Sequence, residues 1–256
     1  MIKAPPSKRL KLDARPFLDV AGATKQLLAA QDAESRQTAA RAVAAACDDT
    51  DDDNKIASRE AVRPLAEMLR GSHGEAEASA LALWKLAIVS QNTLVIAKAG
   101  AIPPLIALLE NGTDLAKEHA AMALWYLTGS YANLLSIARA GSIPPLVALV
   151  ENGTDDAKET ASWILMALIS CEVNILWIVE GGAIPPLVAL LQNGTDEAKQ
   201  NAAGALMMLA DDIDNIDSIV KAGAIPPLVA LLENGTNKAK ENAAAALRQL
   251  PYCRCV

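Results

Sequence analysis

Hydrophobic and polar positions along this chain follow an order that repeats with a constant period of 41. Each period contains a short apolar stretch that ends at a glycine, a second apolar stretch that opens with two prolines, and a longer stretch rich in alanine and leucine. The proline-containing segment is Gly-Ala-Ile-Pro-Pro-Leu at 100–105, and related copies begin at Gly141, Gly182 and Gly223. A strict period of this length is typical of a solenoid, whose units bury their apolar faces only by stacking on one another.

One unit, residues 92–132, indicates where its helices begin and end. The glycine at position 100 predicts the end of a short first helix that starts near Asn92. Pro103 and Pro104 lack N–H groups, so they fit only the first turn of a second helix. Asn111-Gly112 predicts a turn, and Thr113 is expected to cap a long third helix. The inner face of that third helix is predicted to carry Ala116, Ala120, Ala123, Leu124 and Leu127.

Three helices in each period, with Ala-Gly-Ala-Ile-Pro-Pro-Leu before the second and Ala-Leu-Trp-Tyr-Leu at the end of the third, resemble the armadillo repeat. The resemblance implies an all-α, right-handed armadillo solenoid of about six three-helix repeats. We expect a basic tail over 1–14, the solenoid over 15–250 and a short tail over 251–256. The expected repeats are a degenerate first one near 15–50, a weaker second one near 51–91, and regular ones over 92–132, 133–173, 174–214 and 215–250. The first keeps Gly22-Ala23 and Leu27-Leu28, and the second keeps Ala61-Val62-Arg63-Pro64-Leu65.

Composition and charge narrow the class of protein. Hydrophobic residues make up 52% of the chain but aromatic residues only 3%, so small aliphatic side chains must fill the core. No apolar run approaches the roughly 18 residues of a membrane span. Residues 1–16 hold five basic residues and one acidic residue, a net charge of +4; because the chain carries −7, the rest carries −11. This acidic body argues against nucleic-acid binding and is compatible with basic protein partners.

The four cysteines and the two tails carry weak signals. Cys47, Cys171, Cys253 and Cys255 contain no Cys-x-x-Cys pair, which argues against a zinc site or a disulfide framework and favours a reduced cytoplasmic or nuclear setting. Cys253 stands fourth from the end, as prenylation requires, but Arg254 does not fit that motif, so a chain end without lipid is the favoured interpretation. At the other end, Lys8, Arg9 and Lys11 resemble a nuclear-import signal, and a solvated tail is an equally weighted alternative.

We identify no catalytic residue, metal ligand or cofactor-binding residue. His73 and His119 occupy non-equivalent positions of their repeats, and both are interpreted as solvated surface histidines. The acidic run from Asp48 to Asp53 lacks the glycine and final glutamate of a calcium loop, so we interpret it as a solvated linker. These interpretations predict a protein that is not an enzyme.

In the armadillo family the third helices line a concave groove that binds partner segments. Equivalent positions of successive repeats form columns across this face, and two columns are rich in tryptophan, methionine and tyrosine, while a third is Glu77, Glu118, Glu159, Gln200 and Glu241. The aromatic and methionine side chains either contact a partner or fill gaps between repeats. The carboxylates either pair with a basic partner or simply stabilise the N-terminal end of their own helix. The candidate groove residues are Trp84, Lys85, Glu118, Met122, Trp125, Tyr126, Glu159, Trp163, Met207 and Met208.

Importin α uses a tryptophan and, four residues on, an asparagine to hold basic import signals. The asparagine positions here hold Lys85, Tyr126, Ala167, Met208 and Gln249, so that function is not implied. We expect a non-enzymatic scaffold that binds an extended or helical protein segment, basic or apolar, in the cytoplasm or nucleus. The alternative is a structural solenoid that associates with itself, because the last repeat lacks a diverged polar cap and leaves an apolar end face.

Overall fold

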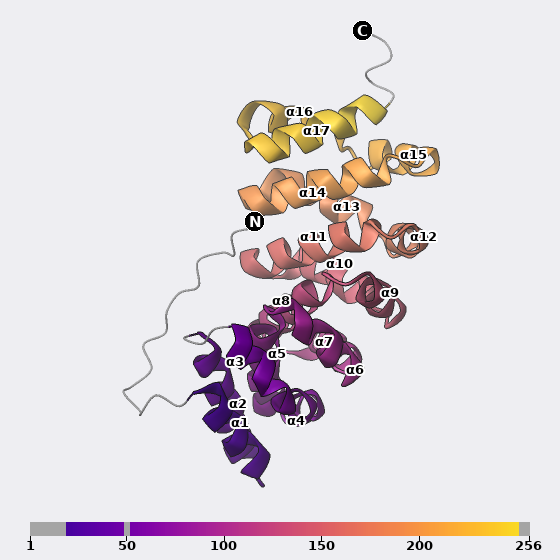
Figure 1. The fold of residues 1–256 in the computed structure, drawn as a ribbon. Coiled ribbons are helices and arrows are strands. Elements are labelled where there is room, and N and C mark those ends of the chain that lie inside the picture. Colours follow the sequence, from indigo (N-terminus) through magenta and orange to yellow (C-terminus); the bar gives the residue numbers. More distant parts are fainter. Residues whose placement is uncertain (1–18, 49–51, 251–256) are drawn as a thin grey trace.

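The computed structural model describes residues 19–48 and 52–250, and all regular structure within them is helical. The helices stack from α1 at one end to α17 at the other (Figure 1), which confirms the predicted all-α solenoid. No single described helix is long and apolar enough to cross a membrane, although four sharply bent helix pairs would qualify by length and composition alone.

A triplet of helices occurs four times in succession, with the period that the sequence predicts. The first triplet is α6 (Ser90–Lys98), α7 (Ile102–Asn111) and α8 (Asp114–Leu127). The others are α9 (Tyr131–Arg139), α10 (Ile143–Asn152), α11 (Asp155–Ile169), α12 (Glu172–Glu180), α13 (Ile184–Asn193), α14 (Asp196–Leu209), α15 (Ile213–Lys221), α16 (Ile225–Asn234) and α17 (Asn237–Gln249). Prolines stand in the first turn of each second helix, as predicted.

The part before α6 is less regular. It contains α1 (Val20–Ala29), α2 (Ala33–Asp48), α3 (Asp52–Ala57), a 3-10 helix (Ser58–Ala61), α4 (Val62–Met68) and α5 (His73–Ala87). Gly22 lies inside α1 rather than at a corner before it, because Asp19 starts that helix by accepting a hydrogen bond from the Gly22 N–H. The acidic run is not simply a solvated linker: Asp48 ends α2 and forms an ion pair with Lys85, while α3 begins at Asp52.

A glycine makes the corner between the first and second helix of each regular repeat. These four glycines have φ between +76° and +82°, in the left-handed region that other residues occupy only with strain. The helices on either side meet at 82–87°. The glycine corner thus turns the chain without a longer loop. The helix before the corner at Gly100 is α6. It begins at Ser90, slightly earlier than the expected start near Asn92.

A buried asparagine ties each first helix to the preceding third helix. Asn92, Asn133, Asn174 and Asn215 are the third residues of their helices, and their side-chain amides donate to the carbonyl oxygens of Leu86, Leu127, Leu168 and Leu209 at 3.0–3.1 Å. The last carbonyls of a helix have no partner within it, so these bonds satisfy groups that would otherwise be buried without one.

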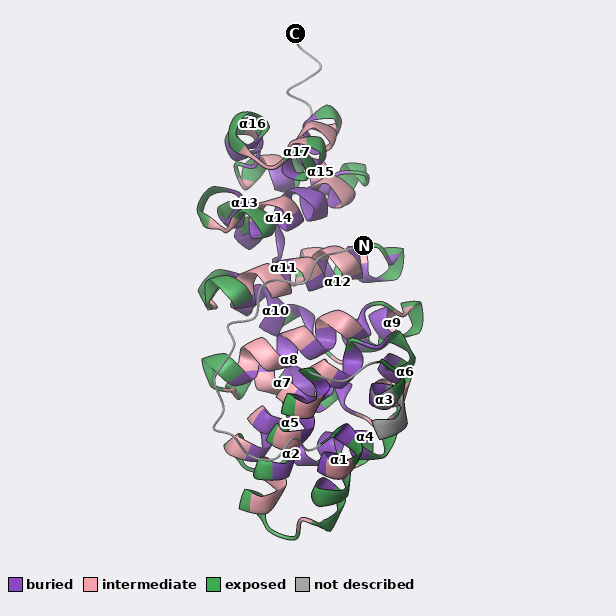
Figure 2. Ribbon diagram, turned by 60° about the vertical axis from the view of Figure 1, so that its left-hand side comes forward, coloured by how far each residue is buried: buried purple, intermediate pink, exposed green. Residues whose placement is uncertain are grey.

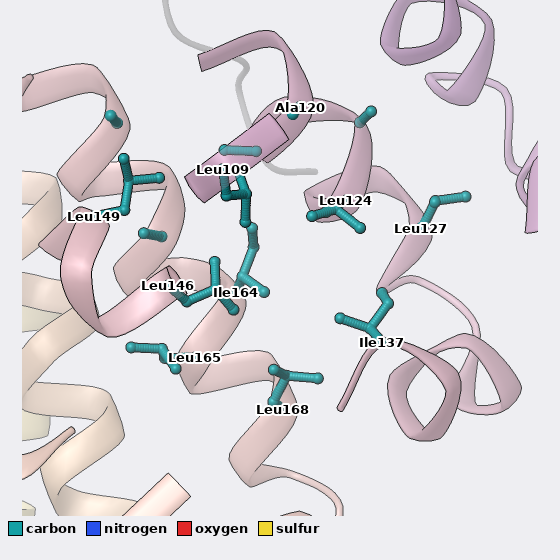
Figure 3. Packing of buried hydrophobic residues seen from close by; sticks show 14 of the residues in the cluster. Leu109, Ala120, Leu124, Leu127, Ile137, Leu146, Leu149, Ile164, Leu165 and Leu168 are labelled. Carbon is teal, nitrogen blue, oxygen red and sulfur yellow. The ribbon is translucent and has the colours of Figure 1, made fainter. Parts of the chain in front are cut away.

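The core runs the length of the array and consists of small aliphatic side chains. Figure 3 shows Leu124 and Leu127 of α8, Ile137 of α9, Leu146 of α10 and Ile164 of α11 within one buried cluster. The predicted inner face of α8 is fully buried, because its alanines allow close helix packing. Exposed positions gather at helix ends, while half-buried ones run along α8 and α11 (Figure 2).

Candidate functional site

The third helices α5, α8, α11, α14 and α17 pack side by side, each on the next (Figure 1). We call their outward surface the third-helix face. All ten residues predicted for the groove lie on these helices and are half-buried. They are neither sealed in the core nor fully solvated, as a surface that contacts a partner requires.

Four aromatic rings form a continuous row across α5, α8 and α11. The ring centroids of Trp84 and Tyr126 lie 6.4 Å apart with the rings nearly parallel, at 6°. Those of Trp125 and Tyr126 lie 4.9 Å apart, and Trp125 meets Trp163 edge to face at 5.4 Å. The rings of Trp84, Trp125 and Tyr126 also pack against the buried cluster, so the same side chains fill the gaps between repeats and leave one side exposed.

Lys85 closes the N-terminal end of this row. Its Nζ lies 4.1 Å from the centroid of the Trp84 ring and is paired with Asp48, and its side chain is only 11% exposed. A cation over an indole contributes about 0.5–2 kcal/mol. Lys85 therefore holds α2, α5 and the aromatic row together, and it is not free to meet a partner's acidic group.

Beyond α11 the face changes from aromatic side chains to methionines. Position 204 lies in the same column as Trp163 and Met122 but is a glycine, and a shallow depression of about 220 Å³ opens there. A Cβ at Gly204 would lie 2.8 Å from the Met166 Sδ and 3.0 Å from the Asn242 Nδ2. The depression is lined by Met166, Gln200, Asn201, Gly204, Met207, Met208, Lys238 and Asn242.

The glutamate column joins successive repeats. The hydroxyl of each N-cap threonine accepts a hydrogen bond from the N–H three residues on, at 3.1–3.2 Å, which confirms the predicted Thr113 cap. The same hydroxyl donates to the column residue of the preceding repeat: Thr113 to Glu77 at 3.0 Å, Thr154 to Glu118 at 2.6 Å, Thr195 to Glu159 at 3.2 Å and Thr236 to Gln200 at 3.2 Å. Burial raises the pKa of Glu159, against the lowering effect of the Thr195 bond.

The column that contains His119 also lies between neighbouring third helices. His119 is half-buried, and burial lowers its pKa, so its interpretation as a solvated surface residue is wrong; His73 is exposed. Asn201 and Asn242, at the equivalent positions two and three repeats on, donate to the carbonyls of Glu159 and Gln200 at 3.3 and 3.1 Å. This column therefore links helices rather than forming a reactive centre.

The remaining candidates for chemistry are few. Among the described residues no group of three or more His, Cys, Asp or Glu is placed to hold a metal ion. Burial raises the pKa of the Cys47 thiol to about 12, which keeps it protonated and unreactive. Lys8, Arg9 and Lys11 of the import-like motif lie outside the described residues, as do Cys253 and Cys255.

The comparisons with known proteins agree with this geometry. The Armadillo/beta-catenin-like repeat family matches residues 90–129, 171–206 and 212–250. The designed armadillo repeat protein YIII(Dq)4CqI is 24% identical, with a TM-score of 0.81 over 91% of this chain and 100% of its own. Computationally designed armadillo repeat proteins for modular peptide recognition are 23% identical, with a TM-score of 0.82 over 91% of this chain and 100% of their own. A designed armadillo repeat protein in complex with the peptide (KR)4 is 23% identical, with a TM-score of 0.77 over 91% of this chain and 99% of its own.

A search among curated proteins finds no significant match. The repeating triplet, the glycine corners and the family match on three separate segments nevertheless lead to the same conclusion. The described part of the chain is an armadillo-repeat solenoid.

Proposed function

We propose that this chain is a non-enzymatic scaffold whose third-helix face binds an extended or helical segment of another protein. The observation that carries the proposal is the row of four half-buried aromatic rings, together with the depression at Gly204 on the next third helix. Tryptophan and tyrosine anchor protein interfaces, and methionines adapt to irregular side chains. Structural neighbours designed for peptide recognition share the fold, which supports a peptide or protein as the partner.

The partner segment is apolar rather than strongly basic. Glu77, Glu118 and Glu159 each accept a hydrogen bond from a threonine, so they are already part of the scaffold. A lysine stands directly before each of the last two in the sequence, so nearby cations partly offset the negative charge that could attract a basic chain. Apolar side chains of the segment would lie on the aromatic row and enter the depression.

Selection from a random peptide library displayed on phage tests this proposal. We expect the selected peptides to carry spaced leucine, methionine or aromatic residues and to lose binding to the double variant Trp125→Ala, Trp163→Ala. That variant should keep its helical circular-dichroism signal. The exposed Leu94→Ala variant is the matched control, and its binding should not change. Unchanged binding by the double tryptophan variant would remove the third-helix face from the proposal.

The second candidate function is self-association through the C-terminal end face. Val229 and Leu232 of α16 are 45% and 37% exposed, whereas their counterparts Val188 and Leu191 in the preceding repeat are 4% and 3% exposed. The preceding repeat is covered by α16, which indicates that another helix fits this face.

Sedimentation over a range of concentrations separates the two candidates. Self-association predicts a dimer or longer assembly that Val229→Asp with Leu232→Asp returns to a monomer. A wild-type monomer at high concentration would contradict it and leave the scaffold proposal untouched.

A further inference from the structure

The helix α12 is anomalous among the first helices. Its sequence, Glu-Val-Asn-Ile-Leu-Trp-Ile-Val-Glu, is apolar on every side, which is typical of helices that are completely buried. Yet only Asn174 and Ile178 of α12 are buried. Leu176 is 62% and Trp177 37% exposed, and Val173 is also exposed. An exposed apolar surface of this kind is typical of a site of association.

Exposed apolar side chains also stand at the starts of the two neighbouring first helices. Tyr131, the first residue of α9, is exposed, and its hydroxyl oxygen accepts a hydrogen bond from the Cys171 thiol, just before α12, at 3.5 Å. Ile213, the first residue of α15, is also exposed. The first helices α6, α9, α12 and α15 lie together along one edge of the solenoid (Figure 1). We call Tyr131, Val173, Leu176, Trp177 and Ile213 the first-helix patch.

Carboxylates surround the helix starts of this patch. Glu172, Asp212 and Asp214 are exposed, and none of them takes part in an ion pair among the described residues. Asp217 is paired with Lys221 at 2.6 Å. The patch is therefore an apolar surface with an acidic rim, and a complementary surface combines apolar and basic side chains.

The patch belongs to this part of the array rather than to the armadillo fold. Leu94 of α6 occupies the same repeat position as Leu176 and is exposed, but its neighbours Ser90 and Gln91 are polar. In α15 the same position is Asp217. Among the first helices of the described residues, only those from α9 to the start of α15 present several large apolar side chains.

We propose that the first-helix patch is a second docking surface, separate from the third-helix face, and that its occupant is a basic amphipathic helix of a partner protein. Val173, Leu176 and Trp177 stand at positions i, i+3 and i+4, the spacing with which one helix packs on another. Lysine or arginine beside the apolar stripe of the partner helix would meet Glu172, Asp212 and Asp214. An anionic membrane is disfavoured because the same carboxylates would repel it.

The test uses a fluorescent peptide of about fourteen residues, with leucines at helical spacing and lysines elsewhere, and a matched peptide in which glutamates replace the lysines. Fluorescence anisotropy should show binding of the lysine peptide only. Leu176→Ser with Trp177→Ser should weaken this binding at least about tenfold. Leu176→Ser alone, which changes the most exposed apolar side chain of α12, should weaken it with no change in thermal midpoint. Glu172→Lys with Asp214→Lys should also weaken it.

Two controls separate this surface from the third-helix face. Leu94→Ser and the double variant Trp125→Ala, Trp163→Ala should both bind the lysine peptide with unchanged affinity. Equal binding of the two peptides, or binding that only the tryptophan variant loses, would overturn the proposal. So would cosedimentation with phosphatidylcholine/phosphatidylglycerol vesicles that depends on α12, or a dimer that the α12 variants dissociate. None of these outcomes would contradict peptide binding on the third-helix face.

Discussion

The two halves of the third-helix face share the same arrangement of helices but are lined by different side chains. From α5 to α11 the face carries Met122 and four aromatic rings, each in contact with the next, whereas from α11 to α17 it carries three methionines around a glycine. The sequence period holds across both halves, and so do the threonine caps. The repeat therefore determines the position of each side chain on the face. The residue types at a few equivalent positions of successive repeats determine what the face can contact.

The largest loss of stability should come from truncating one large side chain in each half of the third-helix face. We expect Trp125→Ala to lower the free energy of unfolding by about 3 kcal/mol, because it removes two ring contacts and opens a cavity next to the core. Met207→Ala should lower the free energy of unfolding by about half as much, because the side chain that it removes is smaller and only partly buried. Urea denaturation followed by circular dichroism measures both values. Equal losses would show that the aromatic row is not the more strongly packed half.

The bonds between repeats should also differ between the halves. Thr154 donates to the charged Glu118, whereas Thr236 donates to the neutral Gln200. We expect Thr154→Ala to cost about 1–2 kcal/mol, and Thr236→Ala about 1 kcal/mol, because a hydrogen bond to a carboxylate is the stronger one. Serine at each position keeps the hydroxyl and serves as the control. A serine variant as unstable as the alanine variant would exclude this explanation.

A pH dependence should be confined to the aromatic half. Burial is the main cause that lowers the pKa of His119 in the folded protein. Below its ordinary pKa the unfolded chain binds a proton that the folded chain resists, so this contribution to stability is present at pH 7.5 and falls as the pH drops below about 6.5. His119→Asn, which copies positions 201 and 242, should reduce the fall in thermal midpoint between pH 7.5 and 5.5. The exposed His73→Asn control should not; if both variants behave alike, His119 is not the cause.

Filling the depression should affect binding more than stability. In Gly204→Ala the new Cβ would meet the Met166 Sδ, near the end of a flexible side chain, and would lie 3.0 Å from the Asn242 Nδ2. Against these contacts, alanine favours a helix by about 1 kcal/mol over glycine. We expect a change in thermal midpoint of no more than a few degrees, together with weaker binding of peptides selected on the wild-type protein. Ala245→Gly, at the same position one repeat later, is the reverse control. Stronger peptide binding by Gly204→Ala would contradict the role of the depression.

The smallest effect on stability should come from deleting residues 1–14. This segment is basic and precedes an acidic body, so we expect it to act in localisation or by occluding the groove. Its deletion should leave the thermal midpoint nearly unchanged and alter the nuclear fraction or the affinity for peptides. A deletion that unfolds the protein would instead make the tail part of the N-terminal cap.

The sequence predicts the regular repeats because each of their boundaries carries its own residue: a corner glycine, paired prolines and a capping threonine. It predicts the start of the array less well, since Gly22 has a corner residue's identity but lies within a helix. It does not predict the two bonds that join repeats. One bond is donated by the asparagine at 92, 133, 174 and 215, and the other by the capping threonine of the next repeat. Both residues recur in the sequence with the period of the repeat. However, the helix pattern within one unit gives no information on contacts between units.

The candidate site shows the same limit. The spacing of Trp84, Trp125, Tyr126 and Trp163 places them on one face, but it cannot show that the rings touch one another. That depends on rotamers and on the distance between neighbouring helices. The interpretation of His119 fails for the same reason, because a histidine between two repeats looks solvated when only its own helix is considered.

The paired links between repeats have a consequence for how such a chain can change its length. Each regular unit donates from one threonine to the unit before it, and each except the last accepts at one carboxylate or amide from the unit after it. A gene segment that encodes one whole period, duplicated or deleted in frame, would leave every junction with the same donor facing the same acceptor. Unequal recombination could therefore lengthen or shorten the array without any compensating mutation, and drift in the exposed columns could then give each new copy its own surface.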